Sequence, residues 1–129
     1  MGVGRYLKER KPGVRIVAVE PPAGEDVQGL RSLEEGYIPP IFDPDVLDRR
    51  FIVRLTESVE WTRRLAELGI FAGLSSGAVM AGVAKTAAAM DEGTIVALLP
   101  DGGWKYLSTG AWTDDIDAVV ERARRIIYF

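Results

Sequence analysis

The sequence predicts an α/β fold in which helices cover both faces of a parallel, or mostly parallel, sheet. Three short segments, 14–19, 51–55 and 94–100, are almost entirely apolar and rich in β-branched residues, which is typical of strands buried on both faces. Segments with helical character alternate with them, and this alternation favours parallel strands joined by helices. Ligands bind beyond the carboxyl ends of such strands, so the loops that follow strands are the expected place for a site.

The N-terminal half is expected to contain one helix, two strands and a long connection. Residues 2–10 (GVGRYLKER) predict a helix that a Lys-Pro-Gly sequence ends, and the first strand follows at 14–19 (VRIVAV). The connection over 20–50 contains five prolines and is too long for a simple turn, although it has room for a short helix over 26–35. Loops of this length are often functional. The second strand is expected at 51–55 (FIVRL).

The helix after the second strand has a recognisable beginning and end. Thr56 resembles an N-cap, and Glu57 and Glu60 lie in the first turn, where the helix dipole favours carboxylates. The helix is expected to run to about Leu68 and to stop at Gly69.

Two more helices and the third strand complete the predicted fold. A helix over about 77–90 follows the sequence GLSSG, and the strand 94–100 (TIVALLP) leads into the loop PDGGWKYLSTG. A final amphipathic helix is expected over 114–127, opened by Asp114 and Asp115. PDGGW follows a strand and GLSSG opens a helix, so we expect both to face the same crevice.

Composition excludes several classes of function. The net charge of −3 and the pI of about 5.0 argue against a nucleic-acid partner. No apolar run approaches the roughly 18 residues of a membrane span, and the N-terminus is too polar for a secretory signal, so we expect a cytoplasmic protein without a membrane partner. Cysteine and histidine are absent, which excludes thiolate chemistry and a Ser-His-Asp triad and leaves no expected metal site. Catalysis would need carboxylates, lysine, tyrosine or a cofactor.

The sequence GLSSGAV, residues 73–79, allows two interpretations. Ser75 or Ser76 could cap the following helix, which is worth about 1 kcal/mol, while the glycines permit tight packing. Alternatively, a serine hydroxyl could bind a ligand. A nucleophilic serine is disfavoured because the chain has no histidine to activate it and the pattern is not GxSxG.

Two other stretches also remain open. LLPDGGW could be a tight Asp-Gly turn, or a floor on which a flat ligand rests, with glycines that allow close backbone approach. Arg31, in GLRSLEEGYIPPIFD, could be an ordinary surface charge or could clamp a phosphate or carboxylate. None of the four lysines has the surroundings expected of a Schiff-base lysine.

Taken together, four segments resemble the cysteine synthase family of fold-type II pyridoxal-phosphate enzymes. They are MGVGRYLKERKPGVRIVAVEP, EEGYIPPIFD, GIFAGLSSGAV and LLPDGGWKYLSTG, in the order and with the spacing of the family. The forms GLRSLEEGYIPP and GWKYLSTGAW are closest to the CysM-like branch, the O-phosphoserine sulfhydrylases. Many acetylserine-using members differ at Arg31 and carry an acidic-basic pair where this chain has Trp104-Lys105.

The resemblance covers nearly the whole chain but only the C-terminal part of such an enzyme. It implies that residues 1–129 are the C-terminal portion of the pyridoxal-phosphate-binding (tryptophan synthase β-like) domain, an incomplete part of the large domain with the N-terminal domain absent. In the family, the Schiff-base lysine and the phosphate-binding loop lie upstream of the residues that match Met1 onward. No catalytic residue is therefore expected in this chain.

Several roles carry over from the family by position. Ser75 matches the serine that hydrogen-bonds the pyridine nitrogen, and a neutral hydroxyl there leaves the nitrogen largely unprotonated, which suits elimination at the β-carbon. Pro100 and Asp101 match positions beside the cofactor ring, and Arg31 matches the arginine near the substrate phosphate. Tyr106 is expected to be structural. Ser76 is left as the cap or packing residue.

The function implied is cysteine biosynthesis by pyridoxal-phosphate-dependent β-replacement. The amino-acid substrate would be O-phosphoserine or O-acetylserine, the sulfur donor sulfide or a protein thiocarboxylate, and the complete enzyme a homodimer. Two alternatives remain. One is a related lyase such as a cystathionine β-synthase or a threonine deaminase. The other is a stand-alone, non-catalytic α/β module that binds a small anion or a partner protein.

We predict that the isolated chain neither turns over substrate nor holds pyridoxal phosphate covalently, because the cofactor lysine of the family has no match in it. Borohydride reduction in the presence of the cofactor, followed by peptide mass spectrometry, should find no modified lysine. A stoichiometric adduct on one lysine would contradict the prediction.

Overall fold

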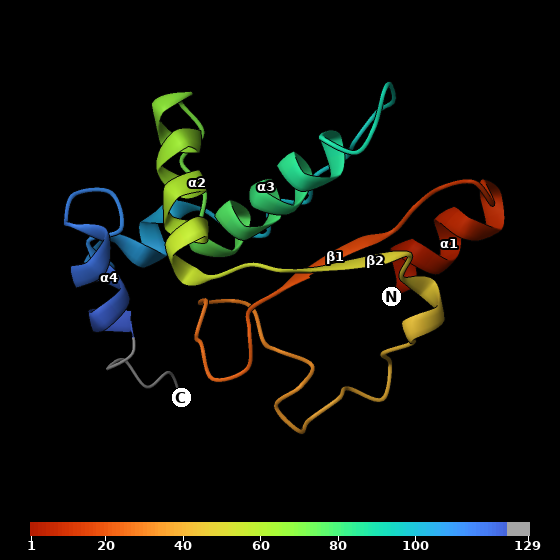
Figure 1. Cartoon of the computed structure of the whole chain (residues 1–129), viewed down its shortest axis with the longest axis horizontal. Coiled ribbons are helices and arrows are strands. Elements are labelled where there is room, and N and C mark those ends of the chain that lie inside the picture. The colour runs from red at the N-terminus through yellow and green to blue at the C-terminus, as the bar shows by residue number, and fades with distance from the viewer. Residues whose placement is uncertain (124–129) are drawn as a thin grey trace.

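Two parallel strands, with helices before and after them, form the centre of the chain, which a computed structural model describes over residues 1–123 (Figure 1). The elements in chain order are the helix α1 (Gly2–Arg10), the strand β1 (Val17–Glu20), the 3-10 helix η1 (Pro44–Val46), the strand β2 (Arg49–Ile52), the helices α2 (Leu55–Glu67) and α3 (Leu74–Ala87), the 3-10 helix η2 (Gly103–Thr109) and the helix α4 (Ile116–Ala123). None of the described helices is both long enough and apolar enough to cross a bilayer.

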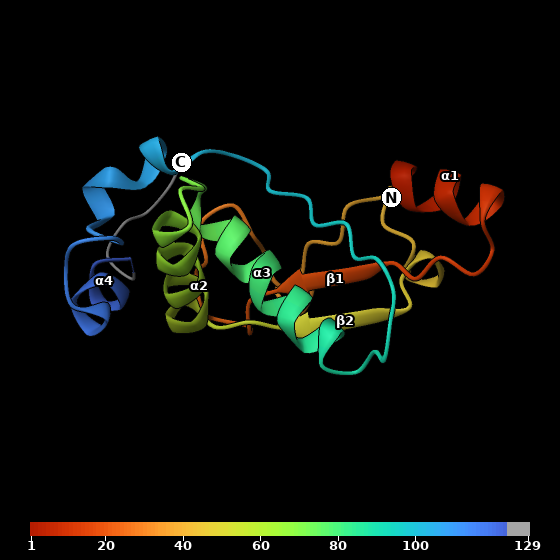
Figure 2. The ribbon, with the colours of Figure 1, turned by 90° about the horizontal axis from the view of Figure 1, so that it is seen from above.

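The sheet consists of β1 and β2, which pair in parallel with Val17 opposite Arg49 and Glu20 opposite Ile52. The predicted α/β class and the parallel pairing of the first two strands are therefore confirmed. Helix α3 packs against one face of this sheet, where Gly82 lies against the side chains of Val19 and Phe51 (Figure 2).

The connection between the strands is irregular, and the short helix expected over 26–35 is absent there. Carboxylates hold this loop in place: Glu20 accepts from the Leu33 N–H at 2.8 Å, and Glu35 accepts from the Gly24 N–H at 2.7 Å. Gly29 has a φ of +86°, in the left-handed region that interrupts a helix. Carboxylates at the end of β1 and in the loop thus accept from backbone N–H groups that a helix would have paired with carbonyl oxygens.

Helix α1 is attached to the loop before β2 through Asp48. This carboxylate accepts from the Ile16 N–H at 2.7 Å and from the Lys8 ammonium at 2.9 Å. The Ile16 N–H first, and then Lys8, lower the pKa of Asp48 below its usual range. A lowered pKa means that the bonds of the ionised group add stability above the unfolded-state pKa, and that this stability is lost as the pH falls through the folded-state value.

Helix α2 begins at Leu55, so the prediction of Thr56 as its N-cap was wrong. The residue before the helix is Arg54, whose side chain makes no capping bond. The Leu55 N–H instead donates to the carboxylate of Glu25, which lies thirty residues earlier in the chain. A carboxylate at this end of a helix also matches the dipole. The predicted end is confirmed, since the helix stops just before Gly69.

Helix α3 begins at Leu74, three residues before the predicted start. Its N-cap is Gly73, which has no side chain to donate or accept, and both Ser75 and Ser76 lie inside the first turn with buried side chains. The helix crosses α2 at Gly77, where a Cβ would overlap the Ser58 carbonyl oxygen. The expectation that a glycine of GLSSG allows tight packing is therefore confirmed.

Residues 94–100 form no strand, contrary to the prediction. The stretch returns from the end of α3 to η2 without pairing with β1 or β2 (Figure 2), and Val96 and Leu98 are 91% and 77% exposed. An apolar, β-branched run indicates a strand that is buried in a sheet, but a strand forms only where a neighbour offers hydrogen bonds. The described residues offer no such neighbour.

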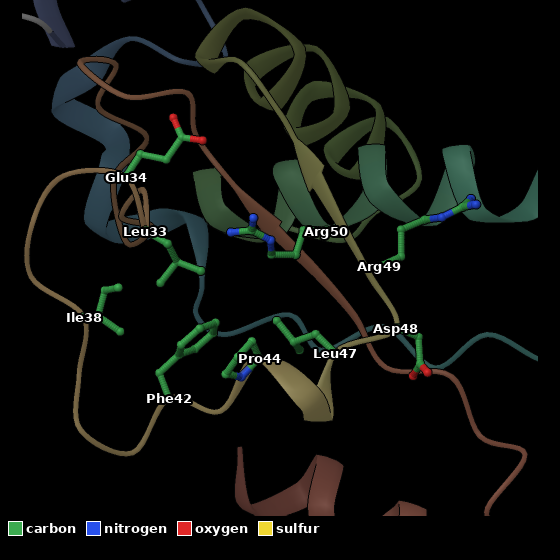
Figure 3. A pocket seen from close by; sticks show the side chains of 9 residues that line it. All are labelled: Leu33, Glu34, Ile38, Phe42, Pro44, Leu47, Asp48, Arg49 and Arg50. Atoms are coloured by element: carbon green, nitrogen blue, oxygen red, sulfur yellow. The ribbon is translucent and has the colours of Figure 1, made fainter.

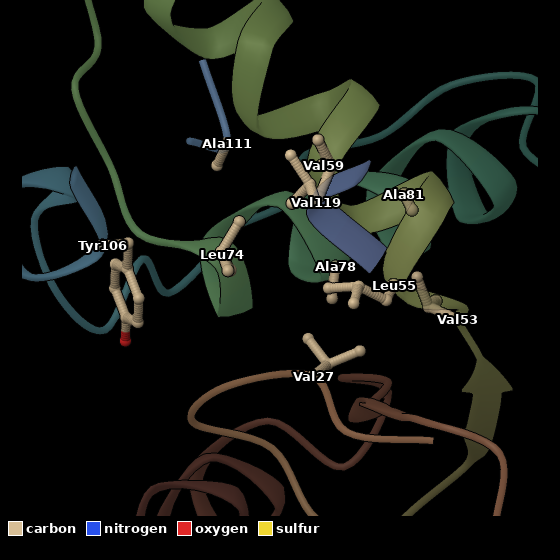
Figure 4. Close-up of a cluster of buried hydrophobic side chains, with 10 residues drawn as sticks. All are labelled: Val27, Val53, Leu55, Val59, Leu74, Ala78, Ala81, Tyr106, Ala111 and Val119. Atoms are coloured by element: carbon tan, nitrogen blue, oxygen red, sulfur yellow. The ribbon is translucent and has the colours of Figure 1, made fainter. Parts of the chain in front are cut away.

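The core lies where α2, α3 and α4 meet the loop that follows β1 (Figure 4). Its buried members are Val27, Val53, Leu55, Val59, Leu74, Ala78, Ala81, Tyr106, Ala111 and Val119. Helix α4 begins at Ile116, and the predicted helix over 114–127 extends beyond the described residues. Asp114, instead of opening the helix, pairs with Arg122 at 2.7 Å, while Asp115 accepts from the Asp117 N–H in the first turn.

We predict that Gly77→Ala lowers the free energy of unfolding by about 1–3 kcal/mol, because the new methyl group overlaps the Ser58 carbonyl and neither backbone can move without repacking. This loss outweighs the roughly 1 kcal/mol that alanine gains over glycine inside a helix. Urea unfolding of the chain measures the change. Gly13→Ala is the control, since no atom lies within 4 Å of its added Cβ, and it should change stability by less than about 0.5 kcal/mol. Equal stability of both variants would contradict close packing at Gly77.

Candidate functional site

The two stretches that sequence analysis expected in one crevice lie side by side. Phe71 accepts from the Gly103 N–H at 3.1 Å, the Gly73 N–H donates to the Asp101 carbonyl at 3.0 Å, and Ala72 forms an antiparallel bridge with Gly102. This short pairing places the first turn of α3 directly against the PDGGW loop. GLSSG and PDGGW are therefore neighbours, as expected, while the crevice that both were expected to face stays a prediction.

Gly73 makes this close approach possible. A Cβ at this position would overlap Oδ1 of Asp101 and would stand 2.5 Å from Cε2 of Tyr106. Both side chains lie against the bare Cα of the glycine, so any larger residue would push them away from the helix.

Ser75 lies in the first turn of α3 and is 2% exposed. Its hydroxyl forms none of the side-chain hydrogen bonds found among the described residues. Across from it lies Gly29 of the long loop: the Ser75 Oγ is 3.4 Å from the point where a Gly29 Cβ would stand, and the Tyr106 hydroxyl is 3.7 Å from the same point. The first turn of α3, the long loop and the η2 segment therefore meet at the Ser75 hydroxyl.

Ser76 is fully buried, and its hydroxyl finds no hydrogen-bond partner within residues 1–123. The predicted capping role is wrong for both serines, because the cap position belongs to Gly73. The alternative that remained for Ser76, a packing residue, agrees with its complete burial.

Asp101 carries the negative charge of the site. Its Oδ2 accepts from the Tyr106 hydroxyl at 2.6 Å and lies 3.6 Å from the Lys105 ammonium. Its Oδ1 is buried and has no partner in the described part of the chain. Pro100, which was predicted beside the cofactor ring with Asp101, is exposed at the end of the unpaired stretch.

Arg31 lies on the exposed surface of the long loop, two residues after Gly29. Its guanidinium stands 5.8 Å from the ring centre of Tyr37, and it forms no ion pair with another described residue. The structure places it near the chain segment that contacts Ser75 but does not bring it into contact with Ser75 or Asp101.

Sequence reasoning did not identify three features near the site. Tyr106 was expected to be structural, and its burial in the core agrees with this, but its hydrogen bond to Asp101 was not foreseen. Gly29 was not singled out, because a lone glycine in a loop carries no distinct signal. Gln28 is 8% exposed, and its side-chain nitrogen has no partner in the described chain. Only the spacing of Asp101 and Tyr106, within one turn-rich segment, could have suggested that they meet.

A separate hollow lies between the long loop and β2 (Figure 3). It has a volume of about 460 Å³ and is lined by Leu33, Glu34, Ile38, Phe42, Pro44, Leu47, Asp48, Arg49 and Arg50. Arg50 is bound to the buried carboxylate of Glu20 at 2.9 Å, so its charge is largely satisfied. None of the predicted site residues lines this hollow, and the candidate site at Ser75 rests on the sequence resemblance. Nowhere in residues 1–123 do three or more acidic side chains form a group that could hold a metal ion.

The model of the pyridoxal-phosphate dependent enzyme family matches residues 1–101. This match covers most of the chain, and the chain belongs to that family. Cysteine synthase B of Pseudomonas aeruginosa is 39% identical to it over 113 residues, which are 87% of this chain and 38% of that protein. The resemblance to the cysteine synthases is thus confirmed.

Solved structures agree with this assignment. A cysteine synthase of Entamoeba histolytica superposes with a TM-score of 0.78 at 28% identity, covering 98% of this chain and 42% of the other. An O-acetylserine dependent cystathionine beta-synthase from Helicobacter pylori gives 0.76 at 33% identity, covering 86% and 39%. The chain spans less than half the length of each of these proteins.

The residues at the candidate site fit the family's cofactor. Ser75 carries a hydroxyl donor at the start of α3, and an aromatic nitrogen is a suitable acceptor for it. Asp101 has a buried oxygen without a partner in residues 1–123, at the contact between Gly73 and the loop that follows residue 100. This donor set is compatible with a flat ring that carries an acceptor nitrogen.

We predict that Ser76→Ala raises the free energy of unfolding by about 1 kcal/mol, because a buried hydroxyl without a partner costs about 1–3 kcal/mol and alanine also favours the helix. Thermal or urea unfolding measures it. Ser58→Ala is the matched control: this buried hydroxyl donates to the Leu74 carbonyl at 2.5 Å, so its removal should destabilise the chain. A loss of stability in Ser76→Ala would show that its hydroxyl is bonded in the folded protein.

Proposed function

We propose that the chain is the C-terminal portion of the cofactor-binding domain of a cysteine synthase, which makes cysteine by β-replacement on an activated serine. The observation that carries this proposal is the position of the buried residue Ser75 in the first turn of α3, which is set beside the Asp101–Tyr106 pair in a chain of the pyridoxal-phosphate family. The names of the similar cysteine synthases support it. The complete enzyme would be a cytoplasmic homodimer that also contains the cofactor lysine.

Pyridoxal phosphate, when bound, supplies the electron withdrawal that weakens the α-C–H bond of the amino-acid substrate. The residues of this chain orient that group. Ser75 would donate a hydrogen bond to the ring nitrogen without delivering a full proton, because a hydroxyl is a far weaker acid than a pyridinium. Asp101 and Pro100 would hold the ring from the loop that follows the third apolar segment. The loop at Gly29 lies across from Ser75 and would help to exclude water.

Arg31 is proposed to bind the phosphate of O-phosphoserine. Its guanidinium is exposed and without an ion pair in the described chain, so it gives up only its contact with the Tyr37 ring when it turns to a substrate. Its planar fork fits a phosphate bidentately, and the bond is strong because both groups are charged. The sulfur donor would be sulfide or a protein thiocarboxylate.

A cystathionine β-synthase activity is the second candidate, favoured by the likeness to the Helicobacter pylori enzyme. The two candidates share the half-reaction at the activated serine and differ in the thiol that adds. Supplying sulfide or homocysteine to the same enzyme distinguishes them by whether cysteine or cystathionine accumulates.

We predict that the complete enzyme forms cysteine from O-phosphoserine and sulfide, and that Arg31→Ala lowers kcat/KM for O-phosphoserine roughly 10- to 100-fold while changing the value for O-acetylserine less than about threefold. A charge-assisted hydrogen bond contributes about 1.5–3 kcal/mol, which corresponds to this range. Steady-state kinetics with both donors measure it. Arg10→Ala is the control, since Arg10 is also exposed and lies over a tyrosine ring, at 4.9 Å from Tyr6.

Equal losses with both donors would refute the phosphate role of Arg31 but leave the enzyme assignment standing. No cysteine from either donor would refute the assignment itself.

A further inference from the structure

We infer that Tyr106 is a positioning residue of the cofactor site: its hydroxyl holds the Asp101 carboxylate in place and so keeps that charge away from the ring nitrogen bound by Ser75. The inference rests on the proposed function, because it concerns the cofactor ring that Ser75 is proposed to bind. It goes beyond that function by assigning a role to a side chain that touches neither substrate nor cofactor in the proposal.

The Tyr106 ring is held rigidly. It is 8% exposed, belongs to the buried core and lies at its edge beside Leu74 (Figure 4). Its Cε2 packs against the bare Cα of Gly73. The η2 segment that carries it is braced by Thr109, whose hydroxyl donates to the Tyr106 carbonyl at 2.6 Å. The phenol oxygen therefore has a fixed position relative to the first turn of α3.

The phenol bond determines where the Asp101 carboxylate points. Tyr106 donates to Oδ2 at 2.6 Å, a short bond of the charge-assisted kind. Lys105 is the cation near this carboxylate, but its side chain is more than half exposed and its ammonium lies 3.6 Å away, so water weakens the ion pair. Oδ1 is buried against Gly73 and has no partner in residues 1–123. Tyr106 is thus the buried donor that the described structure provides for this carboxylate.

The same hydroxyl also lies on the side of Ser75. Tyr106 OH and Ser75 Oγ stand 3.7 Å and 3.4 Å from one point, the position of a Gly29 Cβ. Asp101, which abuts Gly73 two residues before Ser75, would be free to rotate if the phenol were removed. A carboxylate that approaches the ring nitrogen stabilises the protonated form, as a nearby opposite charge does for any base.

The test compares Tyr106→Phe with the wild type in the complete enzyme, reconstituted with pyridoxal phosphate labelled with ¹⁵N in the ring. Phenylalanine keeps the ring against Gly73 and removes only the hydroxyl. Because Tyr106 does not contact the ring in the proposal, we expect the dissociation constant of the cofactor to rise by less than about tenfold, which would be the full effect of one lost hydrogen bond of about 1.4 kcal/mol. We also expect the ¹⁵N resonance to move toward the protonated pyridinium position.

Two further variants make the result specific. Tyr6→Phe, on the exposed surface of α1, controls for the loss of a phenol and should match the wild type. Adding Asp101→Asn to Tyr106→Phe removes the carboxylate that had been released, so the ¹⁵N resonance should return toward its wild-type position. A merely structural tyrosine would not give this rescue.

Four outcomes would overturn the inference. If Tyr106→Phe matches the wild type in affinity and ¹⁵N shift, the hydroxyl positions nothing. If it weakens binding without moving the ¹⁵N resonance, or if Asp101→Asn fails to restore the resonance, Tyr106 is structural only. If the wild-type enzyme does not bind pyridoxal phosphate, the proposed function fails and this inference with it.

Discussion

The site depends on the backbone pairing between residues 71–73 and 101–103. Two hydrogen bonds and one antiparallel bridge bring the start of α3 against the loop that follows residue 100. The pairing requires a residue without a side chain at Gly73, because Asp101 and Tyr106 occupy the space of its Cβ. Without this contact, Ser75 and Asp101 would belong to separate surfaces. The local chemistry of the site thus follows from how closely two backbones can approach.

Carboxylates play a second organising role, since they hold in place the long irregular loop in which a short helix was expected. Glu20, Glu25 and Glu35 each accept from a backbone N–H that is distant in sequence. Glu25 accepts from the Leu55 N–H in the first turn of α2, so this bond ties the loop to the helix. Gly29, which faces Ser75, is carried by this loop. The geometry around Ser75 therefore depends on charged groups that contact no ligand in the proposed mechanism.

Much of the fold could be predicted because the relevant signals are local. The helix at residues 2–10, the end of α2 at Gly69 and the parallel pair of β-branched segments all follow from periodicity, stop signals and composition. The caps could not be predicted in the same way. Thr56 has the right chemistry for a cap, but Glu25 reaches the helix end from thirty residues away. The apolar run 94–100 has the composition of a strand and remains unpaired, because strand formation also requires a neighbour.

The sequence by itself determined the class of fold, the family resemblance and the two segments that form the site, because each is written in short, contiguous patterns such as GLSSGAV and LLPDGGW. Only the tertiary structure decided that Gly73, and neither serine, caps α3, and that Tyr106 binds Asp101. It also decided that Gly29 stands opposite Ser75. The contact between Gly29 and Ser75 joins segments that are far apart in the chain, and the contact between Tyr106 and Asp101 forms within one turn-rich segment. Their distances are set by packing, which no local pattern of residues encodes.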